Sequence, residues 1–172
     1  MKRVIFLVVA CTTFFLLSFT CLNIYDYITT QGHCSISFPG IPEESTDTSR
    51  SENGTPFKIH LVTYAPTDND VFMLGWIDMN SFYPENKTLR TMLEDSRDGA
   101  TKSLGATEVN TTQINLINEP FIEFTFKGPN IIGKDRIYLI NKFQYSLITL
   151  FVNATTIPAS SEKFIQSFKH LK

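Results

Sequence analysis

Residues 120–151 most limit what this chain can fold into, because they read as three strands joined by two short turns. Ile122, Phe124 and Phe126 alternate with polar residues, which is the period of a strand with one buried and one exposed face. Asn141-Lys142 fits a two-residue turn, since asparagine tolerates the left-handed backbone that such turns need. Because short links join antiparallel neighbours, the stretch predicts an antiparallel meander.

The last of these strands, residues 143–151, carries apolar side chains on both of its faces. Tyr145 and Leu147 point one way, and Ile148 and Leu150 point the other way, because successive side chains of a strand alternate. We therefore expect a central strand that is covered on both sides.

Two helices are predicted around this meander. The first covers residues 87–104, where apolar residues recur at helical spacing, with Asn86 as the N-cap and Gly105 as the stop. The second follows Pro158 and has an apolar stripe that should be buried on the sheet, formed by Phe164, Ile165 and Phe168. Shorter alternating runs before and after the first helix predict further strands at residues 34–38, 57–64, 71–77 and 109–117. This order predicts an α+β domain with helices packed on an antiparallel sheet.

The N-terminus reads as a targeting segment and not as part of the core. Lys2 and Arg3 precede a run with no charged residue before Asp26. We divide the chain into a signal anchor or signal peptide at residues 1–25, a spacer at 26–33 and a folded domain at 34–172. In each case the basic end stays in the cytoplasm and the remainder is exported, to the periplasm or the cell surface.

Three fates of this segment are compatible with its sequence. About 20 apolar residues at about 1.5 Å each would span a bilayer, which favours an uncleaved anchor. A cleaved signal peptide is the second fate, although the small-residue cleavage pattern is poor. The third is a lipoprotein with Cys21 as the lipidated residue; its depth is suitable, but Phe19 and Thr20 before it fit poorly. Cys11 has better neighbours, but too short an apolar stretch precedes it.

Composition argues against nucleic-acid binding and against a disulfide-stabilised fold. The formal net charge is −2, so the sequence has no electrostatic footprint for nucleic acid. The cysteines are Cys11, Cys21 and Cys34, and two of them lie in the apolar run, so the folded domain has no internal disulfide framework.

Residues 36–42, Ile-Ser-Phe-Pro-Gly-Ile-Pro, resemble the F-P-G-x-P opening of extracytoplasmic bacterial domains of the Mog1/PsbP-like superfamily. The run from Arg136 to Leu139 and the ending from Phe164 to Phe168 follow in the order that this family shows. The resemblance covers residues 34–170 and implies an α/β/α sandwich around a curved antiparallel sheet flanked by helices. It implies no activity, since its best-known relatives support a photosynthetic complex or bind a small GTPase. No binding residue of theirs matches here.

Few residues suggest chemistry. His33-Cys34 could be a nucleophile or half of a metal site, but His60 and His170 are isolated and no second ligand has the right spacing. Residues 68–70, Asp-Asn-Asp, lack the glycine and the later glutamate of a calcium loop. We therefore predict no catalytic residue, no cofactor and no metal site.

Two weaker signals remain. Phe72, Trp76, Phe82 and Tyr83 could line a groove beside the long helix, although aromatic residues more often pack in a core. Four N-x-[ST] triplets would be glycan sites in a eukaryotic secretory pathway but arise easily by chance in a chain of this composition; they begin at Asn53, Asn86, Asn110 and Asn153.

The first functional hypothesis is a non-catalytic exported module, tethered to the membrane by its N-terminal segment, that binds a protein or another envelope component. The alternative is a small-ligand carrier or enzyme with a pocket between the sheet and the helix at residues 87–104. A cavity lined by convergent polar groups would favour the alternative, and a filled core with an exposed apolar patch would favour the first.

Overall fold

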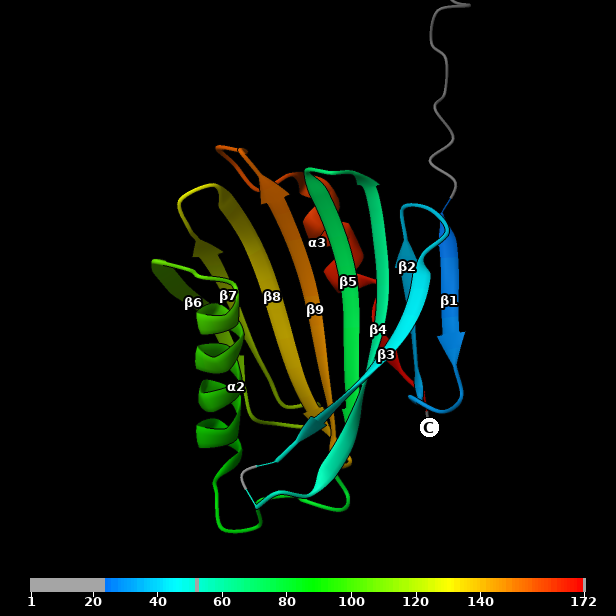
Figure 1. Ribbon diagram of the computed structural model, residues 1–172, viewed down its shortest axis with the longest axis vertical. Coiled ribbons are helices and arrows are strands. Elements are labelled where there is room, and N and C mark those ends of the chain that lie inside the picture. Colours follow the sequence, from blue (N-terminus) through cyan, green and yellow to red (C-terminus); the bar gives the residue numbers. More distant parts are fainter. Residues whose placement is uncertain (1–23, 52, 172) are drawn as a thin grey trace, which may run out of the picture.

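The computed structural model describes residues 24–51 and 53–171, which form two antiparallel sheets and two helices (Figure 1). The small sheet contains β1 (Tyr25–Thr29), β2 (Cys34–Phe38) and β10 (Lys169–His170). The large sheet contains β3 (Glu43–Arg50), β4 (Pro56–Thr67), β5 (Asp70–Asp78), β6 (Glu108–Asn115), β7 (Phe121–Lys127), β8 (Ile131–Ile140) and β9 (Phe143–Val152). The helices are α2 (Leu89–Ser103) and α3 (Ala159–Gln166). The predicted targeting segment lies outside the described residues, except for its last two positions.

The predicted meander is confirmed. The large sheet has the order β3-β4-β5-β9-β8-β7-β6, in which β7, β8 and β9 are antiparallel neighbours. Asn141 and Lys142 have φ angles of 52° and 64°, the left-handed conformation of a two-residue hairpin turn. β9 lies between β5 and β8 and buries side chains on both faces, including Leu147 and Ile148. Its predicted central position is therefore correct.

The predicted helix-flanked α/β/α sandwich is wrong. Strands hold 52% of the described residues and helices only 16%, so this part of the molecule is mostly β. Helix α2 covers one face of the large sheet, and the small sheet with α3 beside it covers the other face (Figure 1). In this second layer β2 buries Cys34, Ile36 and Phe38, and α3 adds Phe164 and Ile165.

The segment expected to be a spacer belongs largely to the fold. β1 pairs with β2 along its full length, from Tyr25 opposite Phe38 to Thr29 opposite Cys34. Tyr27 is buried, and its hydroxyl donates a hydrogen bond to Glu44 in β3 at 3.0 Å. A five-residue strand with one buried side chain is too short to give a periodic signal in the sequence.

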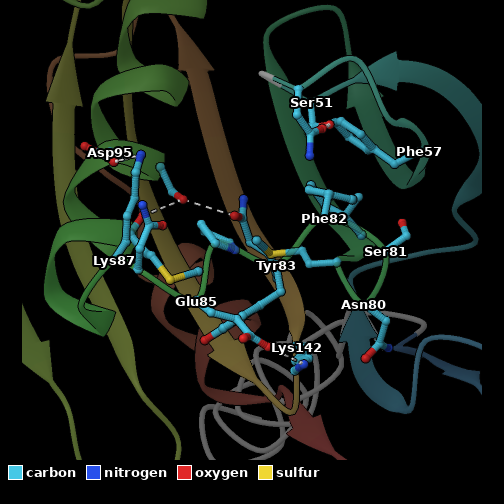
Figure 2. A pocket seen from close by; sticks show the side chains of 18 of the residues that line it. Ser51, Phe57, Asn80, Ser81, Phe82, Tyr83, Glu85, Lys87, Asp95 and Lys142 are labelled. Carbon is cyan, nitrogen blue, oxygen red and sulfur yellow. Dashed lines mark hydrogen bonds and ion pairs between the residues drawn. The ribbon is translucent and has the colours of Figure 1, made fainter.

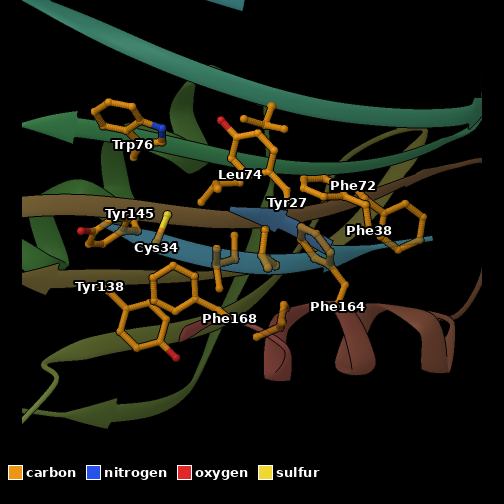
Figure 3. Packing of buried hydrophobic residues seen from close by; sticks show 14 of the residues in the cluster. Tyr27, Cys34, Phe38, Phe72, Leu74, Trp76, Tyr138, Tyr145, Phe164 and Phe168 are labelled. Carbon is orange, nitrogen blue, oxygen red and sulfur yellow. The ribbon is translucent and has the colours of Figure 1, made fainter. Parts of the chain in front are cut away.

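The large sheet has a separate hydrophobic core on each face. Between the two sheets, Phe38, Phe164 and Tyr145 belong to an aromatic-rich cluster (Figure 3). Beneath α2, Leu93 and Phe124 belong to the second cluster. The burial of the last helix was predicted correctly, since its apolar stripe is buried between the sheets: Phe164, Ile165 and Phe168.

One residue on the polar side of β7, Glu123, is buried, although the alternation of the strand predicted an exposed face; Lys127 on the same side is exposed. Glu123 is 5% exposed and contacts Lys134 Nζ at 2.9 Å and Arg136 Nε at 2.8 Å. Burial opposes the ionisation of Glu123, but hydrogen bonds from Lys134 and Arg136 outweigh it and lower the pKa of this carboxyl. Lys134 also pairs with Glu162, so the cluster ties α3 to the sheet.

Helix α2 starts two residues later than predicted, whereas α3 starts directly after Pro158, as predicted. Thr88, and not Asn86, is the N-cap of α2, because its hydroxyl accepts a hydrogen bond from the Thr91 backbone N–H at 3.2 Å. Pro158 occupies the N-cap position of α3 without a side-chain hydrogen bond. Gly105 follows α2 with a φ of 64°, as expected of a glycine that ends a helix.

Candidate functional site

A cleft of about 820 Å³ lies at one end of the large sheet, below the first turns of α2 (Figure 2). Four separate segments line it: the tip of the β3–β4 hairpin, the loop that follows β5, the start of α2 and the turn between β8 and β9. Its volume is within the range of about 300–1,000 Å³ that is usual for ligand sites. This is where the sequence placed the alternative pocket, between the sheet and the long helix.

The loop after β5 is held in place by backbone and side-chain hydrogen bonds. Asp78 Oδ1 accepts from the Asn80 backbone N–H at 2.9 Å, an Asx-type turn that reverses the chain at the end of the strand. The Met79 N–H donates to the Lys142 carbonyl at 2.9 Å, which joins this loop to the β8–β9 turn. The Phe82 N–H donates to the Met79 carbonyl at 3.0 Å. These bonds give the cleft a defined floor.

One wall of the cleft is aromatic. The rings of Phe57 and Phe82 stack with their centroids 4.7 Å apart and their planes 28° apart. Lys142 Nζ lies 5.3 Å from the centroid of the Tyr83 ring, a cation–π contact across the cleft floor. All three rings are only partly buried, so they offer flat apolar surface to a bound molecule.

Two lysines of the cleft pair with carboxylates within it, and Arg50 Nη1 donates to the Gly54 carbonyl at 3.0 Å. Lys87 Nζ lies 2.8 Å from Asp95 Oδ2, and Lys142 Nζ lies 3.6 Å from Glu85 Oε1. Ser96 Oγ donates to Gln144 Oε1 at 3.0 Å, which joins α2 to β9. Exposed ion pairs of this kind are worth about 0–1 kcal/mol each, so a ligand could displace them at little cost. The two ion pairs are neutral as pairs, and Arg50 adds one positive charge to the lining.

The four aromatic residues singled out from the sequence are divided by the structure. Phe82 and Tyr83 line the cleft, as the groove hypothesis expected. Phe72 and Trp76 are instead buried on the opposite face of the sheet, in the core between the sheets. Phe57 was missed as a cleft residue, because its stacking partner is far away in the sequence and strand alternation does not reveal it.

His33 and Cys34 do not form a reactive pair. Cys34 is fully buried between the sheets, and burial raises the pKa of its thiol to about 12. His33 is exposed, has a φ of 48° in the β1–β2 turn, and contacts the ring of Phe143 at a centroid distance of 5.5 Å. The hypothesis of a nucleophile or a metal ligand therefore has no structural support at these two residues.

We expect Cys34 to be unreactive toward an alkylating reagent in native buffer and to be labelled only on unfolding, because the reagent requires an accessible thiolate. Peptide mass mapping distinguishes Cys34 from Cys11 and Cys21. The variant His33→Ala should label as slowly as the parent protein. Rapid labelling of the native protein that slows in His33→Ala would contradict this interpretation.

The remaining sequence candidates are surface features. Asp68 and Asn69 form the β4–β5 turn, in which the Asn69 N–H donates to Thr67 Oγ1 at 3.1 Å, and Asp70 begins β5. Within residues 24–51 and 53–171, no three histidine, cysteine, aspartate or glutamate residues group as metal ligands. The four asparagines of the N-x-[ST] triplets are all exposed, and two of them, Asn53 and Asn86, border the cleft.

Comparison with protein-family models, with curated proteins and with solved structures found no match to this chain. Over the part of the chain that the structure describes, neither helix has the length and apolar character needed to cross a bilayer. The cleft geometry and the sequence are therefore the grounds on which a function can be proposed.

Proposed function

We propose that this protein is an exported module that is tethered to a membrane by its N-terminal segment and binds a protein or another envelope component at the cleft. The observation that carries the proposal is the position of the cleft relative to the start of the fold. The cleft is at the opposite end of the long axis from the first residue of β1 (Figure 1).

The packing of the small sheet supports this placement of the cleft and the start of β1 at opposite ends of the molecule. The turn after β2 lies against β4 near the β4–β5 turn, because a Cβ on Gly40 would clash with the Tyr64 ring. The turn after β1 lies at the other end, because a Cβ on Gly32 would be 2.9 Å from Trp76. Ten-residue strands such as β9 are about 33 Å long and separate the two ends. A tether at residue 24 would therefore hold the cleft away from the bilayer, where a partner can reach it.

The cleft residues favour binding over catalysis. Among the described residues that line it there is no histidine or cysteine, and its lysines lie in ion pairs or aromatic contacts. Aromatic faces beside neutral amide and hydroxyl groups are typical of a surface that recognises shape and hydrogen bonds.

The volume of the cleft also supports a second candidate, a carrier of a small neutral ligand. A mass spectrum of the protein purified under native conditions separates the two functions. A stoichiometric small adduct that is lost on unfolding would favour the carrier.

The substitution Ser81→Trp tests the proposed function. Ser81 is exposed on the cleft loop, so a tryptophan there should obstruct the cleft without entering the core. Ser160→Trp is the matched control, since Ser160 is exposed on the first turn of α3, at the other end of the molecule. We expect partner recovered from crosslinked native membranes to fall strongly with Ser81→Trp and to remain unchanged with Ser160→Trp. Equal recovery with both variants would refute the cleft as the binding site.

Intact mass of the protein extracted from membranes tests the tether. Full-length mass supports an anchor, and a chain that starts at a lipid-modified Cys21 supports a lipoprotein. Recovery in the soluble exported fraction, without the N-terminal segment, would contradict the tether. Recovery from the cytoplasm would contradict export.

A further inference from the structure

We infer that the end of the small sheet at which the chain enters the fold is seated in the lipid headgroup layer, so that the domain is held against the bilayer in a fixed orientation. We call this surface the membrane rim and define it by Ile24, Tyr25 and Ile41. The inference rests on the proposed tether and concerns a different surface from the cleft.

The first step is the short length of chain between the apolar run and the first strand. β1 is paired from Tyr25 onward, and only Asn23 stands between Leu22, at the end of the apolar run, and Ile24. Two residues reach at most about 7 Å. The headgroup layer is itself about 5–8 Å thick on each side of the hydrocarbon. A spanning helix that ends at Leu22 therefore places the start of β1 inside the headgroup layer. A lipid on Cys21 would impose nearly the same limit.

The second step is the apolar character of this end of the sheet. Ile24 and Ile41 are 68% and 78% exposed, and Tyr25 is 41% exposed. Ile28, on the same face of β1 beyond Asp26, is 65% exposed. Exposed isoleucine is costly in water, whereas isoleucine and tyrosine are favourable at a membrane interface. The described part of the chain has eight exposed large hydrophobic side chains. Half of them belong to the rim or to β1 beside it.

The third step is the low charge of the same segment. Between residues 24 and 42, Asp26 is the only aspartate, glutamate, lysine or arginine. The carboxylate of Asp26 has a hydrogen-bond partner, because its Oδ1 accepts from the Ser37 hydroxyl at 2.6 Å. Charges resume at Glu43, where β3 leads away toward the cleft. A lipid surface is therefore a better occupant of the rim than a charged protein surface.

The rim is also rigid. Tyr25 is paired with Phe38, and the turn that carries Ile41 is fitted against the ring of Tyr64 through Gly40. A rigid rim in contact with lipid restricts the tilt of the whole domain. The cleft would then be presented at a constant height above the membrane.

Tryptophan quenching by brominated lipid tests the inference. The full-length protein carries one tryptophan, the buried Trp76, which serves as an internal reference. Ile41→Trp places a second tryptophan on the rim. Ile117→Trp is the matched control, since Ile117 is 72% exposed in the β6–β7 turn at the cleft end. Each protein is reconstituted into phosphatidylcholine vesicles with and without brominated acyl chains, and flotation establishes that it is bound to the vesicles.

We expect the fluorescence added by Ile41→Trp to be mostly lost in the brominated vesicles, and that added by Ile117→Trp to be unchanged. If bromine quenches the two added tryptophans equally in vesicles that carry the protein, the rim is not in the headgroup layer, although the tether stands. Failure of the protein to float with the vesicles would overturn both. Protection of Ile41→Trp from aqueous iodide without any bromine quenching, at a dimeric mass, would assign the rim to a second copy and overturn the inference.

Discussion

Phe164→Ala should lower the free energy of unfolding by about 3–5 kcal/mol, the usual cost of removing a buried phenylalanine ring. Phe164 is 2% exposed, and its ring lies 5.1 Å from that of Phe38 and 5.6 Å from that of Phe72. It therefore joins three parts of the fold, since α3, the small sheet and the large sheet meet at this ring (Figure 3). Equilibrium unfolding in urea measures the loss.

Phe164→Leu is the control for this substitution. It keeps most of the buried apolar volume and should cost less than about 1.5 kcal/mol. A loss below about 1 kcal/mol for Phe164→Ala would mean that α3 is not docked as described, since such a value is typical of a surface substitution.

Asp135→Asn should stabilise the protein above neutral pH. Asp135 is fully buried beneath α2, and burial raises the pKa of its carboxyl to about 7. The Ser146 hydroxyl donates to it at 3.0 Å and offsets only part of this rise. Its neighbours in β8, Lys134 and Arg136, point to the opposite face and pair with Glu123.

The direction of the pH dependence follows from this raised pKa. Between about pH 4 and pH 7 the unfolded chain releases the Asp135 proton and the folded protein retains it, so stability falls as the pH rises. A difference of about 3 pH units between the two pKa values corresponds to on the order of 4 kcal/mol. The amide that replaces the carboxyl in the variant cannot ionise, so this loss is absent there.

Urea unfolding of the parent and of Asp135→Asn at several pH values tests this prediction. The two proteins should be similar near pH 4, and the variant should be more stable by on the order of 4 kcal/mol near pH 8. The difference isolates Asp135, because Glu123 and the other carboxylates are common to both proteins. A difference that does not change between about pH 4 and pH 8 would show that this carboxyl is not buried as described.

The central part of the fold could be predicted because its signals are local. Alternation in β7 and β9, a left-handed turn at Asn141-Lys142 and the apolar stripe of α3 each depend on neighbouring residues. The meander and the docking of α3 were therefore predicted correctly.

The second layer could not be predicted because it depends on distant segments. β1 is short, and β10 has only two residues that pair with β2 from the far end of the chain. The helical layer that family resemblance implied is therefore replaced largely by a sheet. Burial of Glu123 was missed for a similar reason. Its partners, Lys134 and Arg136, lie opposite it only because β8 pairs with β7.

The candidate site was predicted only in outline. A pocket beside the long helix was expected, and Phe82 and Tyr83 were correctly associated with it. The contribution of Phe57 and of Lys142 depends on two hairpins whose tips converge, and tertiary convergence of this kind leaves no trace in sequence periodicity.

Site-specific photo-crosslinking in the native membrane tests the central claim most directly. A photoreactive residue replaces Asn86, which is exposed at the cleft, or Asn130, which is exposed in the β7–β8 turn at the other end. The account predicts a discrete, saturable adduct of one envelope component from position 86 that Ser81→Trp abolishes, and no such adduct from position 130. An adduct at position 130 alone, or the same adducts from both positions with and without Ser81→Trp, would contradict it.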